Sequence, residues 1–515
     1  MLQRIIWLLN RSLYIQFERE SNQLEETQRR VLKDILESNR STLNSRKKKL
    51  TNDSYEEFKK EFPPTNYSDW KELVELERDK NPSTLCEDIK RFQGTSGSTE
   101  SIKWIPYNSK ILNEFDQASS AWIYNLGNLY PGILKGKHYW SLSWVPDNLK
   151  ESTTSDDKEL LPFWKKHLMS KVMVPNPKVV NCKTSQDCFF TTLVELIATQ
   201  ELSLISVWSP TFAINLINML IEYKETIYKC FQNKSWQPYR TDLEWLKFPE
   251  SKRNMTFLLN LNEGNIANIT KEIWPNLTLI SCWDTSTSKI WADKLQEYFK
   301  HCSIQGKGIW ATEAVITIPI NGKYPLAYRS HFYEFECIKT NEIIPSWGLK
   351  EGMKVSPVIT TGNGIYRYKI EDILVVSGYL ESVPCFKFIG RKNTIDMVGE
   401  KIDSESALII CKKFNASTLL AIKNSKKPYY ILLTDNHSTK QEDVESTLRT
   451  YYHYNLARDL NQIGKVQLLH STDPLDIYYK ICDSKSSIKG NIKIEPLKLL
   501  ENIDQIEYLE NLCRN

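Results

Sequence analysis

The stretch Gly94-Thr95-Ser96-Gly97-Ser98-Thr99-Glu100 combines two glycines with four hydroxyl side chains. Glycine lets the backbone adopt positive φ and approach a ligand closely. Successive N–H groups in such a turn, together with hydroxyl donors, form a concave site for an anion such as a polyphosphate. Gly and Ser also dominate ordinary surface turns. Taken alone, the stretch is more typical of a polar turn, so the rest of the chain must decide its meaning.

Outward from this loop, short apolar runs alternate with helical patterns. Residues 103–107 look like a strand, and Ile111, Phe115, Ala118 and Trp122 then recur at helical spacing. Further strand-like runs cover 139–145, 204–208 and 277–283, and helical patterns cover 192–200, the segment from Pro210, and 290–299. This strand-then-helix order predicts an α/β core with a parallel sheet.

The texture changes at Gly306, where short strands separated by Gly and Pro predict a β-rich subdomain. A smaller unit follows residue 400, with strand-like runs at 429–433 and 465–470 around a helical segment at 442–460. We therefore expect an α/β protein with a large domain over 1–400 and a small, mobile C-terminal α+β domain over 401–515, a usual domain size.

Composition narrows the class of protein. The chain has 515 residues, of which 41% are hydrophobic and 25% charged, as in ordinary globular proteins. Its net charge of +4 lacks the basic excess of a nucleic-acid-binding protein. No apolar run is long enough for a membrane helix, and no cleavable signal peptide is recognisable. Eleven scattered cysteines predict reduced thiols in a cytoplasmic protein, and seven isolated histidines give no metal site.

Four further motifs follow the glycine-hydroxyl loop in order. They are Gly306-Lys307-Gly308-Ile309-Trp310-Ala311-Thr312-Glu313, Tyr366-Arg367-Tyr368-Lys369-Ile370-Glu371-Asp372, Phe388-Ile389-Gly390-Arg391 and Gly490-Asn491-Ile492-Lys493. With these motifs the chain resembles the Gretchen Hagen 3 (auxin-responsive promoter) family of acyl acid amido synthetases, and its texture is that of the bacterial members. The resemblance covers nearly the whole chain, including 274–283 and 326–335. It implies an enzyme of the acyl-adenylate-forming superfamily.

The chemistry of such an enzyme can be argued from its needs. Making an amide from a carboxylate needs a better leaving group than oxide, and ATP provides one when the carboxylate attacks the α-phosphate. The enzyme then needs a polyphosphate cradle, a Mg²⁺ ligand, a ribose clamp and a mobile cation. The carboxylic acid and an amine or amino acid are the expected small-molecule partners, with ATP and Mg²⁺ as cofactors.

The resemblance assigns these parts to residues of this sequence. The cradle would be Thr95, Ser96, Gly97, Ser98 and Thr99, and the other nucleotide-binding residues would be Ala311, Thr312, Tyr366, Asp372 and Arg391. Glu313 would hold Mg²⁺, which favours carboxylate oxygen, and Thr312 would lie near the α-phosphate. Asp372 suits the ribose, because a carboxylate accepts from both hydroxyls. Lys493 would be the C-terminal lysine that neutralises developing phosphate charge, and Lys489 competes for that role.

Two departures from the family pattern bear on these roles. Glu371 stands where glycine usually precedes the aspartate, and in a regular strand it would point away from the nucleotide, where it can pair with Lys369. The segment 491–496 departs from the usual C-terminal motif around the lysine. These departures make a degenerate relative, which binds nucleotide or acyl ligand without turnover, one alternative to an acid–amine ligase. Within the same chemistry, a coenzyme A acceptor is the other alternative.

The acyl pocket is the least legible part of the sequence. Trp283, Phe332 and Tyr333 lie where the family would line the acyl or nucleotide site. Trp122, Trp140 and Trp144 fit the core equally well, and for each we expect the core.

Overall fold

The computed structural model describes residues 2–42, 54–79, 84–94, 103–141, 170–285, 288–392, 395, 397–398, 400, 402–423, 427–459, 462–482 and 492–514. A sheet in which every paired strand is parallel forms one lobe of the molecule. Its strand order is β4 (Met173–Val174), β3 (Lys137–Trp140), β5 (Leu202–Ser206), β6 (Leu279–Cys282) and β7 (Ser303–Gly306). All five residues of β5 are buried, as in a parallel strand covered on both faces.

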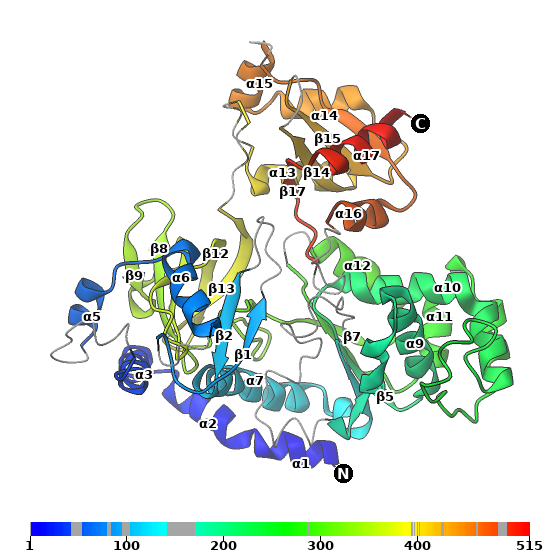
Figure 1. Ribbon diagram of the computed structural model, residues 1–515, viewed down its shortest axis with the longest axis horizontal. Helices are drawn as coiled ribbons and strands as arrows, with labels where there is room; N and C mark the ends of the chain where they lie inside the picture. The colour runs from blue at the N-terminus through cyan, green and yellow to red at the C-terminus, as the bar shows by residue number, and fades with distance from the viewer. Residues whose placement is uncertain are drawn as a thin grey trace.

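Helices pack around this parallel sheet (Figure 1). They are α9 (Ser185–Ala198), α10 (Pro210–Asn233), α11 (Ile266–Ile273) and α12 (Ser288–Tyr298), with 3-10 turns at Pro131–Lys135, Pro177–Asn181, Thr256–Asn260 and Glu263–Asn265. Pro210 begins α10, where proline costs nothing because the first N–H of a helix has no intrahelical partner. The predicted α/β core with a parallel sheet is confirmed.

The second large sheet is antiparallel and carries the β-rich part of the chain. Its strands run in the order β13 (Val383–Arg391), β12 (Asp372–Leu380), β10 (Lys354–Thr360), β8 (Phe332–Cys337) and β9 (Ile343–Pro345), and β11 (Tyr368–Lys369) pairs with β10. A 3-10 turn at Ser346–Gly348 follows β9. A separate hairpin, β1 (Ile89–Gly94) and β2 (Trp104–Asn108), flanks the glycine-hydroxyl loop.

Helices from the N-terminal part of the chain lie beside and below the two large sheets (Figure 1). They are α1 (Leu2–Leu9), α2 (Arg11–Glu20), α3 (Leu24–Ser38), α5 (Tyr55–Glu61), α6 (Tyr67–Arg78) and α7 (Ser109–Leu129). Gln28 of α3 is fully buried. Its amide donates to the carbonyls of Tyr328 and His331 and accepts from the backbone N–H of Tyr333, which attaches α3 to the start of β8.

The C-terminal residues form their own mixed sheet, with strands in the order β16 (Gln467–His470), β15 (Tyr429–Thr434), β14 (Ala416–Ile422) and β17 (Leu497–Leu500). The helices α13 (Ser404–Phe414), α14 (Gln441–Leu448), α15 (Tyr452–Asp459), α16 (Pro474–Cys482) and α17 (Ile503–Arg514) accompany it. In Figure 1 this unit lies above the parallel and antiparallel sheets. The hydroxyls of Tyr479 on α16 and Thr211 on α10 are 2.6 Å apart, so the unit touches the parallel-sheet lobe.

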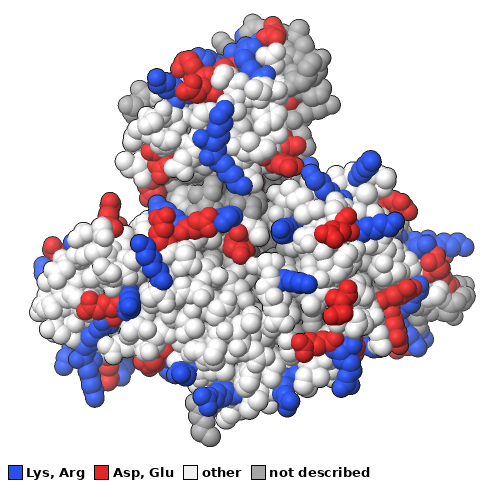
Figure 2. All heavy atoms as spheres, turned by 180° about the vertical axis from the view of Figure 1, so that it is seen from behind, with Lys and Arg blue, Asp and Glu red and all other residues white. Residues whose placement is uncertain are grey.

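All eleven cysteines are free thiols and nine are buried; burial raises the pKa of Cys411 to about 12. Lys and Arg side chains are interspersed with Asp and Glu over the face seen in Figure 2. Within the described part of the chain, no helix is both long and apolar enough to cross a membrane.

Candidate active site

A tight turn presents Thr312 and Glu313 next to the β1–β2 hairpin. The N–H of Ala311 donates to the carbonyl of Ala314 at 2.9 Å, which closes the turn. The hydroxyl of Tyr107, on β2, donates to the carbonyl of Thr312 at 2.7 Å. In the sequence, β2 follows directly on the segment that contains the predicted phosphate cradle, so the turn lies beside the strand that continues the chain from that segment.

Tyrosine hydroxyls surround the half-buried carboxylate of Glu313. The side chain of Tyr368 is hydrogen-bonded to Glu313, and burial, followed by the negative charge of Glu313, raises the pKa of Tyr368. The same charge acts on Tyr67 and Tyr107, whose pKa values are raised mainly by burial. A carboxylate in such a place is a suitable ligand for a hard cation. Among the described residues no group of three potential metal-ligating side chains occurs, so a Mg²⁺ ion here would also need phosphate and water oxygens.

Asp372 and Arg391 are brought together by the antiparallel pairing of β12 and β13. They stand directly opposite each other at the ends of the two strands. Cross-strand partners on one ladder have Cβ atoms about 4.5–5.5 Å apart. The predicted ribose clamp and the predicted phosphate-side arginine thus share one edge of the sheet; the side chain of Arg391 lies outside what the structure describes.

Two lysines near this edge are ion-paired to Glu336 on β8. Lys369 donates to Glu336 Oε1 at 2.8 Å, and Lys392 contacts Oε2. Although burial opposes it, these two hydrogen bonds lower the pKa of Glu336. Lys369 therefore has a partner other than the expected Glu371, whose side chain is exposed.

The segment 366–372 is not the regular strand that its alternation predicts. Only Tyr368–Lys369 pairs as β11, and Arg367 adopts a left-handed backbone with φ of 50°. The Arg367 side chain is thereby turned into the core, where its Nε and Nη2 bond Glu334 at 2.7 and 2.9 Å. Tyr366 is also buried and packs edge-on against Phe62.

Lys493 reaches from the C-terminal unit to the large part of the chain. Its Nζ lies 3.7 Å from the ring centroid of Phe388 on β13 and 5.6 Å from that of Trp283 after β6. Phe388 stands three residues before Arg391 on the same strand. The C-terminal lysine is therefore placed between the Asp372–Arg391 edge and the end of the parallel sheet.

Indole rings gather at the carboxyl ends of the parallel strands, and we call them the tryptophan cluster: Trp122, Trp140, Trp208, Trp283 and Trp310. Neighbouring rings in this cluster lie 5.8–6.0 Å apart between centroids. Lys307, only 2% exposed, extends from β7 into the cluster and donates to Ser206 Oγ at 2.8 Å. Its Nζ lies 4.3 Å from the centroid of Trp208 and 5.7 Å from those of Trp122 and Trp140.

The cluster continues into the other parts of the site. Trp310 immediately precedes the Ala311–Glu313 turn, and its Nε1 donates to the carbonyl of Lys307 at 3.0 Å. The ring of Trp283 lies beside the Nζ atom of Lys493. The carboxyl edge of a parallel sheet is where open α/β proteins usually bind ligands, so the tryptophan cluster lies where a ligand site is expected. Trp122 itself is only 3% exposed and packs in the core, as expected for it.

Two predicted substrate residues lie elsewhere. Phe332 and Tyr333 have no exposed surface. Phe332 packs on Tyr55 and Phe58, and the Tyr333 hydroxyl donates to the carbonyls of Val315 and Ala327. Their surroundings support a packing role. The predicted cradle Thr95–Thr99 and the residue Trp144 lie outside the described residues.

Sequence reasoning missed Lys307, Trp208 and the tyrosines around Glu313. The motif containing Lys307 was recognised, but a lysine between two glycines gives no sign that it is buried. A signal was nevertheless available: Trp208 and Trp283 are each the last residue of a predicted strand, and the carboxyl ends of parallel strands meet at one edge of the sheet.

The fold and these edges together define a two-part α/β protein with a candidate ligand site between its sheets and its C-terminal unit. Residues 13–304 match the GH3 family N-terminal domain and residues 324–391 match the GH3 family central domain. The chain belongs to the GH3 family, as its motifs indicated.

Individual relatives agree with this assignment. The chain is 23% identical over 462 residues to the indole-3-acetic acid-amido synthetase GH3.4 of Arabidopsis thaliana, covering 80% of this chain and 74% of the relative. It is 20% identical to the 4-substituted benzoates-glutamate ligase GH3.12 of the same plant, covering 76% and 73%. A structure of the GH3.15 acyl acid amido synthetase matches with a TM-score of 0.80 at 17% identity, over 96% of this chain and 95% of that one. The overall fold is therefore that of this family.

Proposed function

We propose that this chain is an ATP-dependent ligase that activates a carboxylic acid by adenylation and transfers the acyl group to an amino acid or a related amine. The relatives named above are amido synthetases and ligases of this kind. The observation that carries the proposal is the position of Lys493, which enters from the C-terminal unit between Phe388 and Trp283.

Each part of the site has a task in this reaction. ATP supplies the leaving group: a carboxylate oxygen bonds to the α-phosphorus as pyrophosphate leaves, and the amine nitrogen then bonds to the acyl carbon as AMP leaves. Lys493 balances the negative charge that grows on the phosphates. Glu313 holds Mg²⁺ together with phosphate oxygens, and Asp372 accepts from the ribose hydroxyls.

We place the acid against the tryptophan cluster. Lys307 supplies a buried positive charge that attracts the carboxylate, and the indole faces offer flat apolar walls. Two relatives carry indole-3-acetic acid and 4-substituted benzoates in their names. We accordingly propose that the preferred substrate of this chain is an aromatic acid.

ATP–pyrophosphate exchange tests the first half-reaction. With Mg²⁺ and a panel of indole-3-acetate, substituted benzoates and straight-chain acids, we expect exchange with at least one aromatic acid. Lys493→Ala is expected to lower the exchange by about 100-fold or more. Lys498→Ala, on β17 of the same unit, is the matched control and should exchange at the wild-type rate.

Three outcomes would decide against parts of the proposal. Absence of exchange with every acid, together with absence of ATP binding by calorimetry, would overturn it. A loss in Lys489→Ala in place of Lys493→Ala would move the role of the mobile lysine. A thioester in place of an amide, identified by mass spectrometry of products made with amino acids and with coenzyme A, would make the acceptor a thiol in place of an amine.

A further inference from the structure

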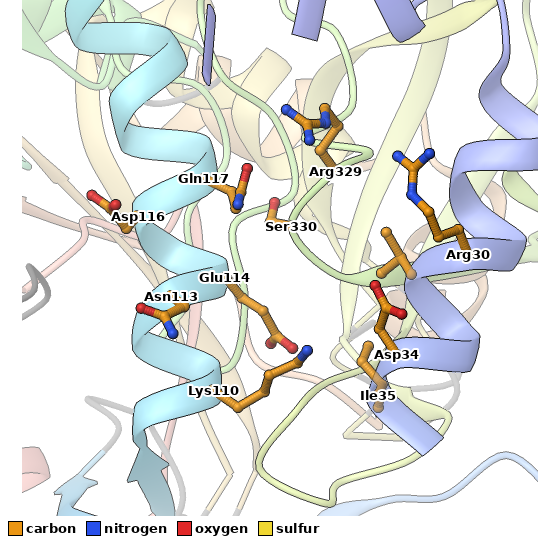
Figure 3. Close-up of a pocket in the computed structure, with 11 residues that line it drawn as sticks. Arg30, Asp34, Ile35, Lys110, Asn113, Glu114, Asp116, Gln117, Arg329 and Ser330 are labelled. Atoms are coloured by element: carbon orange, nitrogen blue, oxygen red, sulfur yellow. The ribbon is translucent and has the colours of Figure 1, made fainter. Parts of the chain in front are cut away.

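A polar pocket of about 350 Å³ opens between helices α3 and α7 and is shown in Figure 3. Its lining comes from these two helices and from the segment before β8: Arg30, Val31, Asp34, Ile35, Lys110, Asn113, Glu114, Asp116, Gln117, Arg329 and Ser330. None of these residues belongs to the candidate active site described above. A volume of this size suits a small molecule.

Three residues of this pocket carry a buried polar atom without a hydrogen-bond partner among the described residues: Glu114 Oε1, Gln117 Oε1 and Arg329 Nη1. Glu114 is only 5% exposed. A buried donor or acceptor without a partner costs roughly 1–3 kcal/mol, and here the two acceptors and the donor belong to residues that line the same cavity. This concentration indicates an occupant that supplies donors on one side and an acceptor on the other.

The carboxylate of Glu114 is held so that one oxygen remains for that occupant. Its Oε2 accepts hydrogen bonds from Nδ1 of His331 at 2.9 Å and from the N–H of Gly362 at 3.1 Å. A Cβ at position 362 would lie 2.5 Å from Oε1, so glycine is needed to leave this oxygen its place. The surrounding protein thus fixes the carboxylate without consuming Oε1.

The charges around the pocket have both signs. Arg30, Lys110 and Arg329 are cationic, and Asp34, Glu114 and Asp116 are anionic. A simple anion would meet three carboxylates and a simple cation would meet three basic groups. A zwitterion avoids both penalties, because each of its charged ends finds an opposite charge.

We propose that this pocket binds a free α-amino acid, with its ammonium group on Glu114 and Gln117 and its carboxylate on Arg329. Glu114 is also connected to the candidate active site through His331. The Nε2 atom of His331 accepts a hydrogen bond from the N–H of Val315, which stands two residues after Glu313. The proposal does not depend on the ligase activity, because binding is measured without ATP and without acid.

Calorimetric titration of the full-length protein with glycine, alanine and glutamate tests the proposal. Propionate and propylamine, which carry only one of the two charges, are titrated beside them. At least one amino acid should bind at millimolar concentration or tighter, and both half-ligands should bind at least about tenfold more weakly. Gln117→Leu keeps the approximate volume, removes one acceptor, and should weaken amino-acid binding about tenfold.

Arg30 and Arg29 form a matched pair of variants on α3. Both are ion-paired to a glutamate and their side chains are 48% and 45% exposed, but only Arg30 lines the pocket. Arg30→Gln should weaken binding, and Arg29→Gln should leave it unchanged. Absence of amino-acid binding would mean that water alone fills the pocket and would overturn the proposal. So would equal binding of the half-ligands, or binding that persists unchanged in both Gln117→Leu and Arg30→Gln, since the ligand would then occupy another site.

Discussion

Arg367 and Lys307 are both buried cations, but their surroundings differ. Arg367 is 5% exposed, and its guanidinium bonds both oxygens of Glu334 and the carbonyls of Lys59 and Phe62. Lys307 is 2% exposed and donates to a hydroxyl among indole rings. Arg367 is surrounded by full and partial negative charge from the protein, which joins α5 to the antiparallel sheet. Lys307 bonds the hydroxyl of Ser206 and lies among indole rings at the carboxyl edge of the parallel sheet.

We propose that this difference separates a cation that maintains the fold from one that serves a ligand. A buried charge is tolerated when hydrogen bonds and an opposite charge replace its hydration. The protein supplies that replacement for Arg367 in full. For Lys307 a hydroxyl and π faces form part of that replacement, and the carboxylate of a bound acid would add an opposite charge. The following predictions test this separation, from the largest expected effect to the smallest.

Removing the partner of Arg367 should have the largest effect on stability. We expect Glu334→Gln to lower the free energy of unfolding by about 3–5 kcal/mol, because it leaves a buried guanidinium without its opposite charge. Urea unfolding followed by tryptophan fluorescence measures this. The double variant Glu334→Leu with Arg367→Met should recover much of the loss, and a double variant as unstable as the single one would contradict the account.

Removing the charge of Lys307 should instead affect activity. Lys307→Met keeps the chain length and apolar stem, so we expect the free energy of unfolding to change by less than about 1.5 kcal/mol. Exchange driven by an aromatic acid should fall about 100-fold, since a preorganised cation is lost. If Lys307→Met unfolds as easily as Glu334→Gln and retains its exchange rate per folded molecule, the two cations have the same role.

Gly306 sets how closely the end of β7 approaches its neighbours. A Cβ there would lie 2.2 Å from Asp284 Oδ1 and 2.3 Å from the hydroxyl of Tyr324. These two groups are hydrogen-bonded to each other at 3.1 Å, and burial raises the pKa of Asp284. We expect Gly306→Ala to destabilise the protein by about 1–3 kcal/mol through overpacking, measured as a lower urea midpoint. Gly264→Ala is a control for crowding, since the nearest atom to its Cβ would be the side-chain oxygen of Asn262 at 3.3 Å and its φ is not positive.

The acid dependence of Glu336 gives the smallest effect. Its pKa lies below the ordinary value of 4.5, despite burial, because Lys369 and Lys392 bond to it. A depressed pKa contributes stability at pH values above that of the unfolded carboxyl, and the contribution is lost as pH falls through the folded pKa. Glu336→Gln should therefore cost about 1 kcal/mol at neutral pH and progressively less below pH 4.5. Urea unfolding over a pH series checks this, and a deficit that persists in acid would assign it to packing.

Much of the architecture was predictable because it depends on local patterns. The alternation of buried strands with amphipathic helices predicted the parallel sheet, and the Gly- and Pro-separated strands predicted the antiparallel one. Asp372 and Arg391 could be identified as candidates from their motifs. Their position opposite each other depends on the register of β12 and β13, which alternation alone does not fix.

The failures also have physical causes. The backbone of Arg367 turns left-handed, so the period of two that assigned faces to 366–372 is interrupted there. Phe332 and Tyr333 belong to β8, in which every residue is buried, and family position alone does not distinguish a core strand from a pocket wall. The burial of Lys307 could not be predicted because lysine side chains are generally exposed.

The cysteines, finally, can report which parts of the molecule open first. Nine of the eleven thiols are buried and two are only partly covered. They lie in the parallel sheet, the antiparallel sheet and the C-terminal unit alike. Alkylation followed by peptide mass analysis would therefore label each thiol at the rate at which its surroundings open. The order of labelling would show whether the C-terminal unit loosens before the two large sheets, without any probe having to be introduced.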